Sequence, residues 1–227
     1  MDQKIITKQN TWNAVSDELS HEHIKPSIYD NTLINLIGNV ENKKILDYGC
    51  GPGILASTLT KLGSSTTKAF DISEDMQKKA GEKIGFDNIY NNILSIPEKT
   101  FDYITCNLVL CIVDEEEVLN IMANIHKSLC DRGTAFIGFC NPLIFNVKHS
   151  QLDMRTDTPY VYCEHHKYWK IKKEGEYKIL EIHRPISWYT QVFEKLGFEL
   201  KGIHFTPEYS YNKRCINDFI IFEITKN

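Results

Sequence analysis

The sequence lacks the features that define several whole classes of protein. Its seven cysteines form no C-x-x-C pair, which argues against a disulfide framework and predicts reduced thiols in a cytoplasmic protein. No apolar run approaches the length of a membrane-spanning helix, and residues 1–13 are polar and mixed in charge, so we expect no membrane segment. With 26 basic and 30 acidic residues and a formal net charge of −4, the chain has no overall basic field, and nucleic acid is not expected as its partner.

Other absences limit the organisation of the chain. There is no internal repeat and no low-complexity tract, and 227 residues with 42% hydrophobic content are enough for one domain over residues 1–227, as a monomer or a homodimer. The lysine-rich stretches 61–83 and 167–173 are interrupted by or lie near acidic residues and are predicted to be solvated faces. No carboxylate or cysteine stands at ligand spacing from His165-His166, so no metal site is expected.

The pattern of the chain predicts alternating strands and helices. A helix over residues 27–37, with Ser27 as its N-cap, leads into strands over 44–48, 66–70, 87–93, 101–107 and 133–140. Helices over 54–62, 73–84 and 114–129 separate these strands, which predicts a parallel sheet. The rhythm is lost at residues 141–184, which we interpret as an inserted substrate cap. A helix over 185–196 and strands over 198–205 and 217–225 follow.

One glycine-rich segment, Ile45 to Gly53, reads as a buried strand that breaks into a turn before a helix. Three glycines let a backbone approach a ligand where a Cβ atom would collide. The carboxylate of Asp47 at the end of the strand would repel a pyrophosphate but suits a cationic amino-acid group, which favours S-adenosylmethionine over NAD. The run from Gly51 to Ala56 also satisfies a dinucleotide fingerprint, G-x-G-x-x-A, with Asp71 near the expected ribose position.

The register of Asp47 and the three glycines resembles the first motif of class I S-adenosylmethionine-dependent methyltransferases, and the order of elements resembles that family over about residues 27–227. The resemblance implies a Rossmann-like, doubly wound α/β fold with a seven-stranded, mostly parallel sheet and an antiparallel terminal hairpin. It also implies that the methionyl end of the cofactor lies along the loop formed by Asp47, Gly49, Cys50, Gly51 and Gly53. Cys50 is expected to be a small packing residue whose amide faces the cofactor.

Asp71, at the end of the second strand, is placed to accept hydrogen bonds from both ribose hydroxyls, because a carboxylate can bind a vicinal diol with two oxygens. Its alternative role as a helix cap is less needed, since Ser73 can serve as the cap. Ile72 and Met76 would lie against the adenine, although a methionine at this spacing is also ordinary core.

The resemblance extends to the ends of the third and fourth strands. Many relatives have an Asp that meets the adenine amino group, and Asn92 stands at this place, with the Ile93 amide available to a ring nitrogen. Asn107 and Leu108 end the fourth strand, where the family's fourth motif lies beside the transferable methyl group. Asn107 is equally well explained as an ordinary turn residue at a strand end.

The acceptor is less clearly indicated. The chain lacks the Asn/Asp-Pro-Pro-aromatic and Pro-Cys signatures of nucleic-acid methyltransferases, and its cap is rich in aromatic side chains that could enclose a small molecule or form a satellite core. The run 183–189 resembles a segment of small-molecule members of the family. His183 is the first candidate for a general base. The residues predicted to bind the acceptor are Trp12 and Tyr29 in an N-terminal helical lid over residues 1–43, and His165, His166, Trp169, Arg184 and Trp188 in the cap.

These observations predict a methyltransferase that moves a methyl group from S-adenosylmethionine to an oxygen or nitrogen of a small-molecule acceptor by in-line displacement. Two alternatives stay open. One is a methyltransferase of RNA or protein, and the other is a NAD-dependent oxidoreductase of the Rossmann type.

Overall fold

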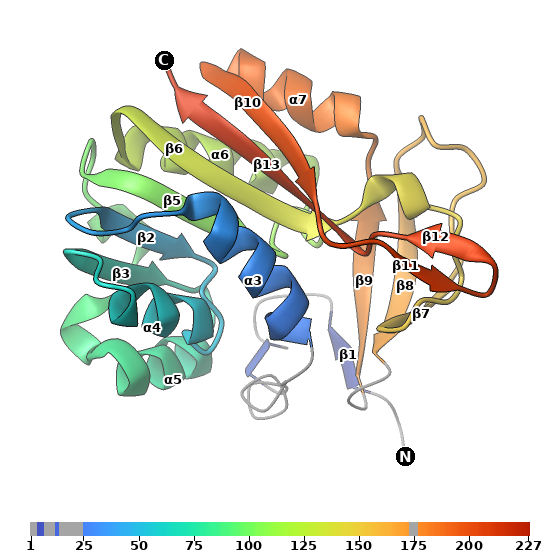
Figure 1. Ribbon diagram of the computed structural model, residues 1–227, viewed down its shortest axis with the longest axis horizontal. Helices are drawn as coiled ribbons and strands as arrows, with labels where there is room; N and C mark the ends of the chain where they lie inside the picture. Colours follow the sequence, from blue (N-terminus) through green and yellow to red (C-terminus); the bar gives the residue numbers. More distant parts are fainter. Residues whose placement is uncertain (1–3, 7–11, 14–24, 173–176) are drawn as a thin grey trace.

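A computed structural model describes residues 4–6, 12–13, 25–172 and 177–227 of the chain (Figure 1). Its main element is a seven-stranded sheet with the order β10-β13-β6-β5-β2-β3-β4. The strands are β2 (Lys44–Tyr48), β3 (Thr66–Phe70), β4 (Ile89–Tyr90), β5 (Phe101–Asn107), β6 (Leu129–Cys140), β10 (Phe198–Phe205) and β13 (Phe219–Lys226).

The direction of the strands confirms the predicted doubly wound sheet. Strands β4, β3, β2, β5 and β6 pair in parallel. Strand β13 is antiparallel to both of its neighbours, β6 and β10, so it alone runs against the other six. The terminal hairpin is extended at its tip by β11 (Tyr209–Tyr211) and β12 (Arg214–Ile216), which pair with each other. The tip of the hairpin is therefore a small two-stranded sheet.

Five helices connect and cover these strands: α3 (Lys25–Ile37), α4 (Ile54–Lys61), α5 (Glu74–Ile84), α6 (Glu115–Ser128) and α7 (Ile186–Lys195). The predicted cap at Ser73 forms, since its side chain accepts a hydrogen bond from the Met76 amide. Asp114 and Glu117 form a reciprocal capping box at the start of α6, which satisfies two backbone donors that a helix end leaves free. By contrast, α3 begins at Lys25, so the prediction that Ser27 caps it is wrong.

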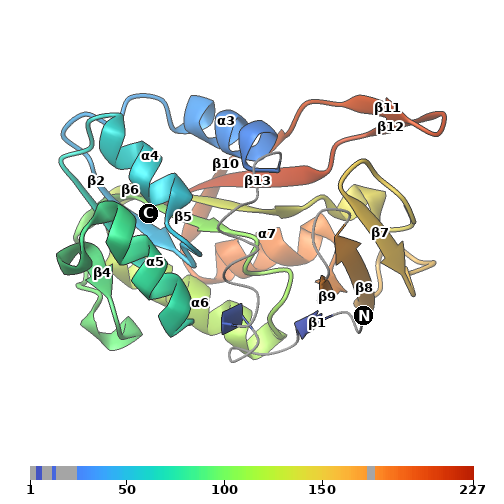
Figure 2. The same cartoon turned by 90° about the horizontal axis from the view of Figure 1, so that it is seen from below.

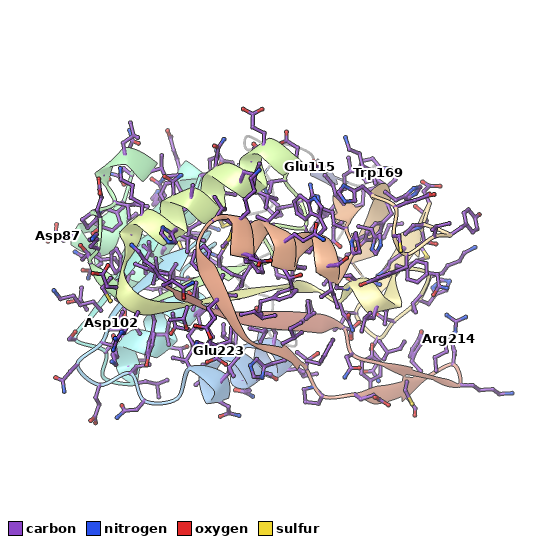
Figure 3. The ribbon with its side chains drawn as sticks, turned by 90° about the horizontal axis from the view of Figure 1, so that it is seen from above. Asp87, Asp102, Glu115, Trp169, Arg214 and Glu223 are labelled. Carbon is purple, nitrogen blue, oxygen red and sulfur yellow. The ribbon has the colours of Figure 1, made fainter. Side chains whose placement is uncertain are left out.

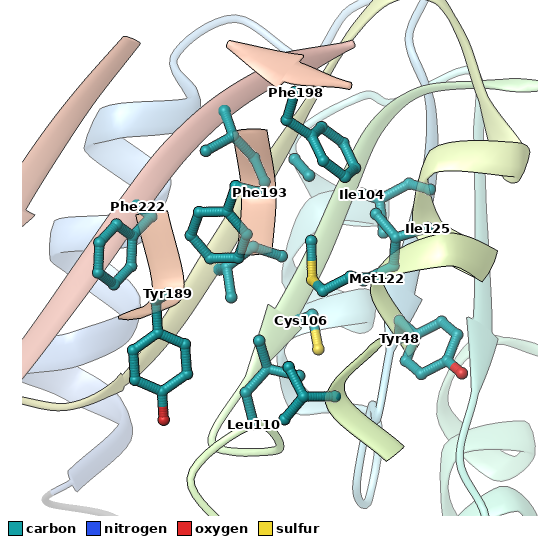
Figure 4. Packing of buried hydrophobic residues seen from close by; sticks show 14 of the residues in the cluster. Tyr48, Ile104, Cys106, Leu110, Met122, Ile125, Tyr189, Phe193, Phe198 and Phe222 are labelled. Atoms are coloured by element: carbon teal, nitrogen blue, oxygen red, sulfur yellow. The ribbon is translucent and has the colours of Figure 1, made fainter. Parts of the chain in front are cut away.

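Helices cover both faces of the sheet (Figures 1 and 2), and apolar side chains are buried on each face. On one face, Leu33 of α3 and Leu59 of α4 pack against Phe136 and Ile221. The other face holds the largest cluster, in which α6 and α7 cover β5, β6 and β13. Figure 4 shows this cluster from close by, with aromatic rings of α7 and β13 on one side and aliphatic side chains of α6 on the other. Burial on both faces explains the apolar run from Ala135 to Cys140 at the end of β6.

The cap forms a second sheet with the order β1-β9-β8-β7. Its strands are β1 (Lys4–Ile6), β7 (Asp153–Thr156), β8 (His166–Lys172) and β9 (Tyr177–His183). Strand β1 pairs in parallel with β9, so a piece of the predicted helical lid is in fact a strand of the cap sheet. Figure 1 shows this sheet standing beyond the arrowheads of β2 and β6, at the carboxyl ends of the parallel strands. Residues 1–3, 7–11 and 14–24 of the predicted lid lie outside the described residues.

The third strand of the main sheet is shorter than the predicted range 87–93. Only Ile89 and Tyr90 pair with β3, and single-turn 3₁₀ helices occupy Phe86–Asn88 and Ile93–Ser95 on either side. Among the described helices, none is both long and apolar enough to cross a lipid bilayer.

Candidate active site

A cavity of about 630 Å³ lies where the parallel strands end beneath the cap sheet. Its walls come from the loop after β2, the ends of β3 and β5, helices α3 and α6, and strand β9. Clefts at the carboxyl ends of parallel strands are the usual ligand sites of doubly wound folds. The volume falls within the range of small-molecule sites.

The glycine loop forms one wall. Gly49, Gly51 and Gly53 all have positive φ angles, of 74°, 53° and 76°, a conformation that costs other residues free energy. The Gly49 and Cys50 amides donate to the Phe70 carbonyl at 2.7 and 3.0 Å, which ties the loop to β3.

Gly53 has a different role from the one predicted. It does not line the cavity, and a Cβ atom there would lie 2.8 Å from the Ala80 backbone. Gly53 therefore lets α4 pack closely on α5, whereas Gly49, Cys50 and Gly51 line the cavity.

Asp47 lines the cavity at the end of β2 and is almost fully buried, with 2% of its surface exposed. Its Oδ1 atom accepts a hydrogen bond from the Thr105 hydroxyl at 2.8 Å. Its Oδ2 atom is buried and has no hydrogen-bond partner within the described part of the chain. Burial raises the pKa of Asp47 to about 7, the nearby Asp30 and Asp71 add to the shift, and the Thr105 bond opposes it. An unpaired buried carboxylate needs a donor or a cation, and a ligand ammonium would supply both.

Asp71 also lines the cavity, and its two oxygens accept backbone amides, Gly51 at 2.8 Å and Ser73 at 2.9 Å. Burial raises its pKa, and the hydrogen bonds from Ser73 and Gly51 oppose that shift. Each carboxylate oxygen can accept a second hydrogen bond, so the ribose role remains a prediction that the geometry permits. The Ser73 hydroxyl also contacts the Asn13 side chain, which brings residues 12–13 close to this edge of the cavity.

The residues predicted to surround the adenine all line the cavity, namely Ile72, Met76, Asn92 and Ile93. Ile72 is half exposed while Met76 is buried. Asn92 also caps the 3₁₀ helix that follows it, because its Oδ1 atom accepts the Leu94 amide at 2.9 Å. Its side chain therefore has a structural role in addition to the predicted contact with the cofactor.

The end of β5 carries a second unpaired polar group. The Tyr29 hydroxyl donates to Asn107 Oδ1, and the buried Asn107 Nδ2 has no hydrogen-bond partner among the described residues. A Cβ atom at Gly138 would collide with the Tyr29 hydroxyl, so this pair depends on a glycine in the neighbouring strand. Leu108 adopts a left-handed conformation with φ 59°, which is strained for this residue type. Tyr29, Asn107 and Leu108 all line the cavity.

The far wall, beneath the cap, is formed by β9. Tyr177, Ile179 and Glu181 alternate along this strand and line the cavity. Tyr177 and Ile179 cluster with the partly buried Trp12 and Ile112. Tyr177 is one of the aromatic cap side chains predicted to enclose a small molecule, whereas Ile179, Glu181 and Ile112 were not predicted. The alternation over residues 177–183 was the signal that could have revealed them, because side chains two apart share one face of a strand.

Glu181 belongs to a buried charged cluster in the cap sheet, formed by Arg155, Asp153, Lys170, Lys172 and Glu181. Lys170 Nζ lies 2.8 Å from Glu181 Oε1 and 3.3 Å from Asp153 Oδ2, and Lys172 Nζ lies 3.1 Å from Asp153 Oδ1. The prediction that lysines 167–173 form a solvated face is therefore wrong for Lys170 and Lys172.

Burial by itself would raise the pKa of Glu181, but the Lys170 ammonium and the hydrogen bonds from Lys170 and Tyr168 outweigh it, and the pKa is lowered. Cys111, Cys140 and Glu181 place ligand atoms within 4.8 Å of one another, a spacing that could hold a metal ion. Lys170 Nζ contacts both Cys140 Sγ and Glu181 Oε1, so a cation already occupies this position.

His183, the predicted general base, does not line the cavity. It is buried on the cap side, where its Nε2 atom lies 2.8 Å from the Tyr162 carbonyl oxygen and its ring packs against Phe145 and Tyr162. Burial lowers its pKa. The structure thus places His183 as a packing residue, and it corrects the interpretation of this side chain as a base.

Arg184 is likewise outside the cavity wall and has a structural contact instead. Its guanidinium donates to the Leu110 and Val113 carbonyls at 3.0 and 2.7 Å. The Ile182 amide donates to the Cys111 carbonyl at 2.7 Å. The loop that follows β5, which carries the cavity residues Val109, Ile112 and Val113, is therefore fastened to β9 and to Arg184.

The four remaining cap residues predicted to bind the acceptor also lie outside the cavity wall. His165 Nδ1 is 2.6 Å from Glu115 Oε1 at the start of α6, and its ring packs edge-on against Trp188. His166 Nε2 is 2.6 Å from the Asp157 carbonyl oxygen. Trp169 lies on the cap (Figure 3), where Lys178 Nζ is 4.8 Å from its ring centre. These four cap side chains therefore pack outside the cavity, and the wall of the cavity on the cap side is β9.

The fold and this cavity define a doubly wound α/β protein that binds a nucleotide-like cofactor at its glycine loop. A sequence family described as a methyltransferase domain matches residues 21–173, which is more than half of the chain. The chain belongs to this methyltransferase family.

Curated relatives match parts of the chain. An uncharacterized protein of Haemophilus influenzae is 28% identical over 129 residues, which make up 52% of this chain and 47% of that protein. A ribosomal protein L11 methyltransferase of Thermotoga petrophila is 33% identical over 96 residues, 40% of this chain and 31% of the relative. A ubiquinone biosynthesis O-methyltransferase of Hydrogenovibrio crunogenus is 41% identical over 68 residues, 30% and 27% of the two chains. The chain matches less than half the length of each of these relatives.

Solved structures share the fold. An S-adenosylmethionine-dependent methyltransferase of Mesorhizobium loti superposes with a TM-score of 0.68 at 16% identity, over 90% of this chain and all of the other. The 1,6-didemethyltoxoflavin-N1-methyltransferase of Burkholderia thailandensis, solved with S-adenosylhomocysteine, gives 0.58 at 14% identity, over 97% and 91%. At these identities the likeness concerns the fold alone. Membership of the methyltransferase family agrees with the prediction that S-adenosylmethionine is the cofactor.

Proposed function

We propose that this chain is an S-adenosylmethionine-dependent methyltransferase that methylates an oxygen or nitrogen of a small-molecule acceptor. The observation that carries the proposal is the pair of unpaired buried groups, Asp47 Oδ2 and Asn107 Nδ2, beside a loop of positive-φ glycines in one cavity. A buried donor and a buried acceptor that lack partners are costly unless a ligand satisfies them. The ammonium of the methionyl group suits Asp47, and the carboxylate of the same methionyl group suits the backbone amides at the start of α4.

Bound there, the cofactor would supply an electrophilic methyl group. The lone pair of the acceptor takes this group as the carbon–sulfur bond breaks towards sulfur, and the acceptor releases its proton to bulk solvent. The role of the protein in this reaction is positioning and exclusion of water. The loop after β5 is fastened by Arg184 and β9, and it holds Val109 and Ile112 against the cavity. Since no histidine lines the cavity within the described part of the chain, the proposal assigns no histidine base.

A small acceptor is supported by the shape of the site. The acceptor wall is the apolar face of β9 with Trp12 and Ile112, and apolar walls with few polar groups suit small organic ligands. Within the described lining no lysine or arginine is present, whereas a nucleic-acid substrate calls for cations near its phosphates. One relative is named as a ribosomal protein L11 methyltransferase, so a protein acceptor is the alternative to a small molecule.

Isothermal titration of the purified protein with S-adenosylhomocysteine and, separately, with NADH tests the cofactor. We expect binding of the first alone, and binding of NADH alone would overturn the proposal. The variant Asp71→Asn should weaken S-adenosylhomocysteine about 10- to 100-fold, the range expected for hydrogen bonds to a charged group. The matched control is Asp75→Asn, an exposed carboxylate in the first turn of α5, which should bind like the wild type. Unchanged affinity in Asp71→Asn would refute the ribose assignment.

A further inference from the structure

The charges around the cavity are strongly biased in sign. Five carboxylate residues line it, namely Asp30, Asp47, Asp71, Glu117 and Glu181, and none of the lining residues in the described part of the chain is lysine, arginine or histidine. In the proposed function Asp47 and Asp71 serve the cofactor, and the start of α4 takes the carboxylate of the methionyl group. Asp30, Glu117 and Glu181 are then left. Glu117 is exposed and belongs to the capping box of α6, so Asp30 and Glu181 set the sign of the remaining wall, with no cation in the described lining to pair an anionic acceptor.

Within the described lining, the cap contributes one ionised side chain to the acceptor wall, that of Glu181 in β9. It follows Tyr177 and Ile179 on the same face of β9, so it ends an apolar strip formed by these two side chains with Ile112 and Trp12. Its carboxylate is held in place, because Lys170 Nζ donates to Oε1 at 2.8 Å and the Tyr168 hydroxyl donates to Oε2. Oε1 also accepts the Cys140 thiol at 3.5 Å, so Oε2 is the oxygen that can accept a further hydrogen bond.

The cluster behind Glu181 explains why this group stays an acceptor of hydrogen bonds. Lys170 is shared with Asp153 at 3.3 Å, and both ammonium groups of the cluster are buried in the cap sheet. Neither Lys170 nor Lys172 lines the cavity. The cations therefore keep Glu181 ionised from behind, while the surface that an acceptor would meet is the carboxylate.

We propose that Glu181 selects the acceptor. The substrate is a compact, largely apolar compound whose N–H or O–H group donates a hydrogen bond to Glu181. This compound is uncharged or cationic and carries no carboxylate or phosphate. The inference rests on the proposed function, since it assumes that the cofactor fills the glycine-loop end. An anionic acceptor would place a like charge beside Asp30 and Glu181, which opposes its binding. The aromatic side chains Trp12 and Tyr177 would in addition favour a cation over an anion.

Three matched probes test this selection on the wild-type protein saturated with S-adenosylhomocysteine. Tyramine, 4-ethylphenol and 4-hydroxyphenylacetate share a phenol ring and differ in the charge at the other end. We expect tyramine and 4-ethylphenol to bind at least about tenfold more tightly than the carboxylate, which corresponds to about 1.4 kcal/mol or more. Tighter binding of 4-hydroxyphenylacetate, or no binding of any probe at millimolar concentration, would overturn the proposal.

A variant assigns the effect to the residue. Glu181→Gln keeps the size of the side chain but removes its charge, and it should weaken tyramine at least tenfold while S-adenosylhomocysteine binds within about twofold of wild type. Glu164→Gln makes the same change at an exposed cap position outside the cavity wall and should change neither. Equal tyramine affinity in both variants would refute the role of Glu181.

If Glu181→Gln fails to fold, the double variant Glu181→Gln/Lys170→Met removes both partners of the ion pair and serves in its place. A protein that binds no S-adenosylhomocysteine refutes the proposed function itself, whereas one that binds it but prefers the anionic probe refutes only the acceptor class.

Discussion

The buried carboxylate of Asp47 gives a prediction about stability that can be worked out from the structure. In the substitution Asp47→Asn the side chain keeps its size and can still accept the Thr105 hydroxyl. Asp47 is 2% exposed and its pKa is raised to about 7, first by burial and then by Asp30 and Asp71. An unfolded aspartate has a pKa of about 3.9. Between these values the folded protein holds a proton that the unfolded chain has released.

The sign follows from linkage, because stability falls with pH wherever the folded state binds more protons. Without cofactor, the wild-type protein therefore loses stability as pH rises from about 4 to about 7, by an amount of about 4 kcal/mol for a shift of about three pKa units. The variant Asp47→Asn removes this loss but leaves an amide donor unpaired, at a cost of about 1–3 kcal/mol. We expect it to be about 1–3 kcal/mol more stable than wild type at pH 8 and less stable at pH 4.

The assay is denaturant unfolding of both proteins at pH 4, 6 and 8 in the absence of cofactor, with Asp87→Asn as the control at an exposed site (Figure 3). The quantity to compare is the difference between variant and wild type, since other groups titrate equally in both. A difference that does not change with pH would refute the reasoning. The variant Asp47→Asn should also bind S-adenosylhomocysteine about 10- to 100-fold more weakly than wild type, because the methionyl ammonium loses its partner.

Two further substitutions test packing and charge. Gly53→Ala should destabilise the protein by about 2–4 kcal/mol in denaturant unfolding, since it combines a left-handed φ with a close approach to the Ala80 backbone. The control Gly51→Ala has open space around its Cβ atom and should cost only about 1–2 kcal/mol. Equal costs for the two variants would contradict the packing role of Gly53. Lys170→Met should destabilise the folded protein by about 3–5 kcal/mol, because it leaves Glu181 as a buried charge without its cation. Adding Glu181→Leu should restore stability. If it does not, loss of the Lys170–Glu181 ion pair is not the cause of the destabilisation.

Much of the fold could be predicted because local signals agreed with the tertiary structure. Strands 44–48, 66–70 and 101–107 were predicted with the bounds that the structure has, since they are short apolar runs between clear turn signals. The helix starts at Ser73 and Asp114 were also found, because capping residues stand directly before the helices there. The cofactor side of the cavity followed from the same strand ends.

The cap sheet could not be predicted by the same rules, because its buried face is charged. In β8 the buried side chains include Tyr168, Lys170 and Lys172, while Trp169 and Ile171 are less buried. A period-two hydrophobic pattern read from the sequence therefore assigns these residues to the wrong faces. The pairing of lysines with Asp153 and Glu181 across the sheet depends on the tertiary structure, and no local sequence pattern predicts it. The error over His183 has the same origin, since a short motif does not show which way a side chain points.

The pairing of β1 with β9 has a consequence for the order of folding. Residues 4–6 lie beside residues 177–179 in the cap sheet, so this pairing joins two segments that are far apart in the sequence. Contacts between segments so distant in sequence carry a large loop-closure entropy and form slowly. The parallel strands and their helices, which join near neighbours, can assemble beforehand. We therefore expect the wall of the acceptor site to be completed late in folding, after the glycine loop that would hold the cofactor.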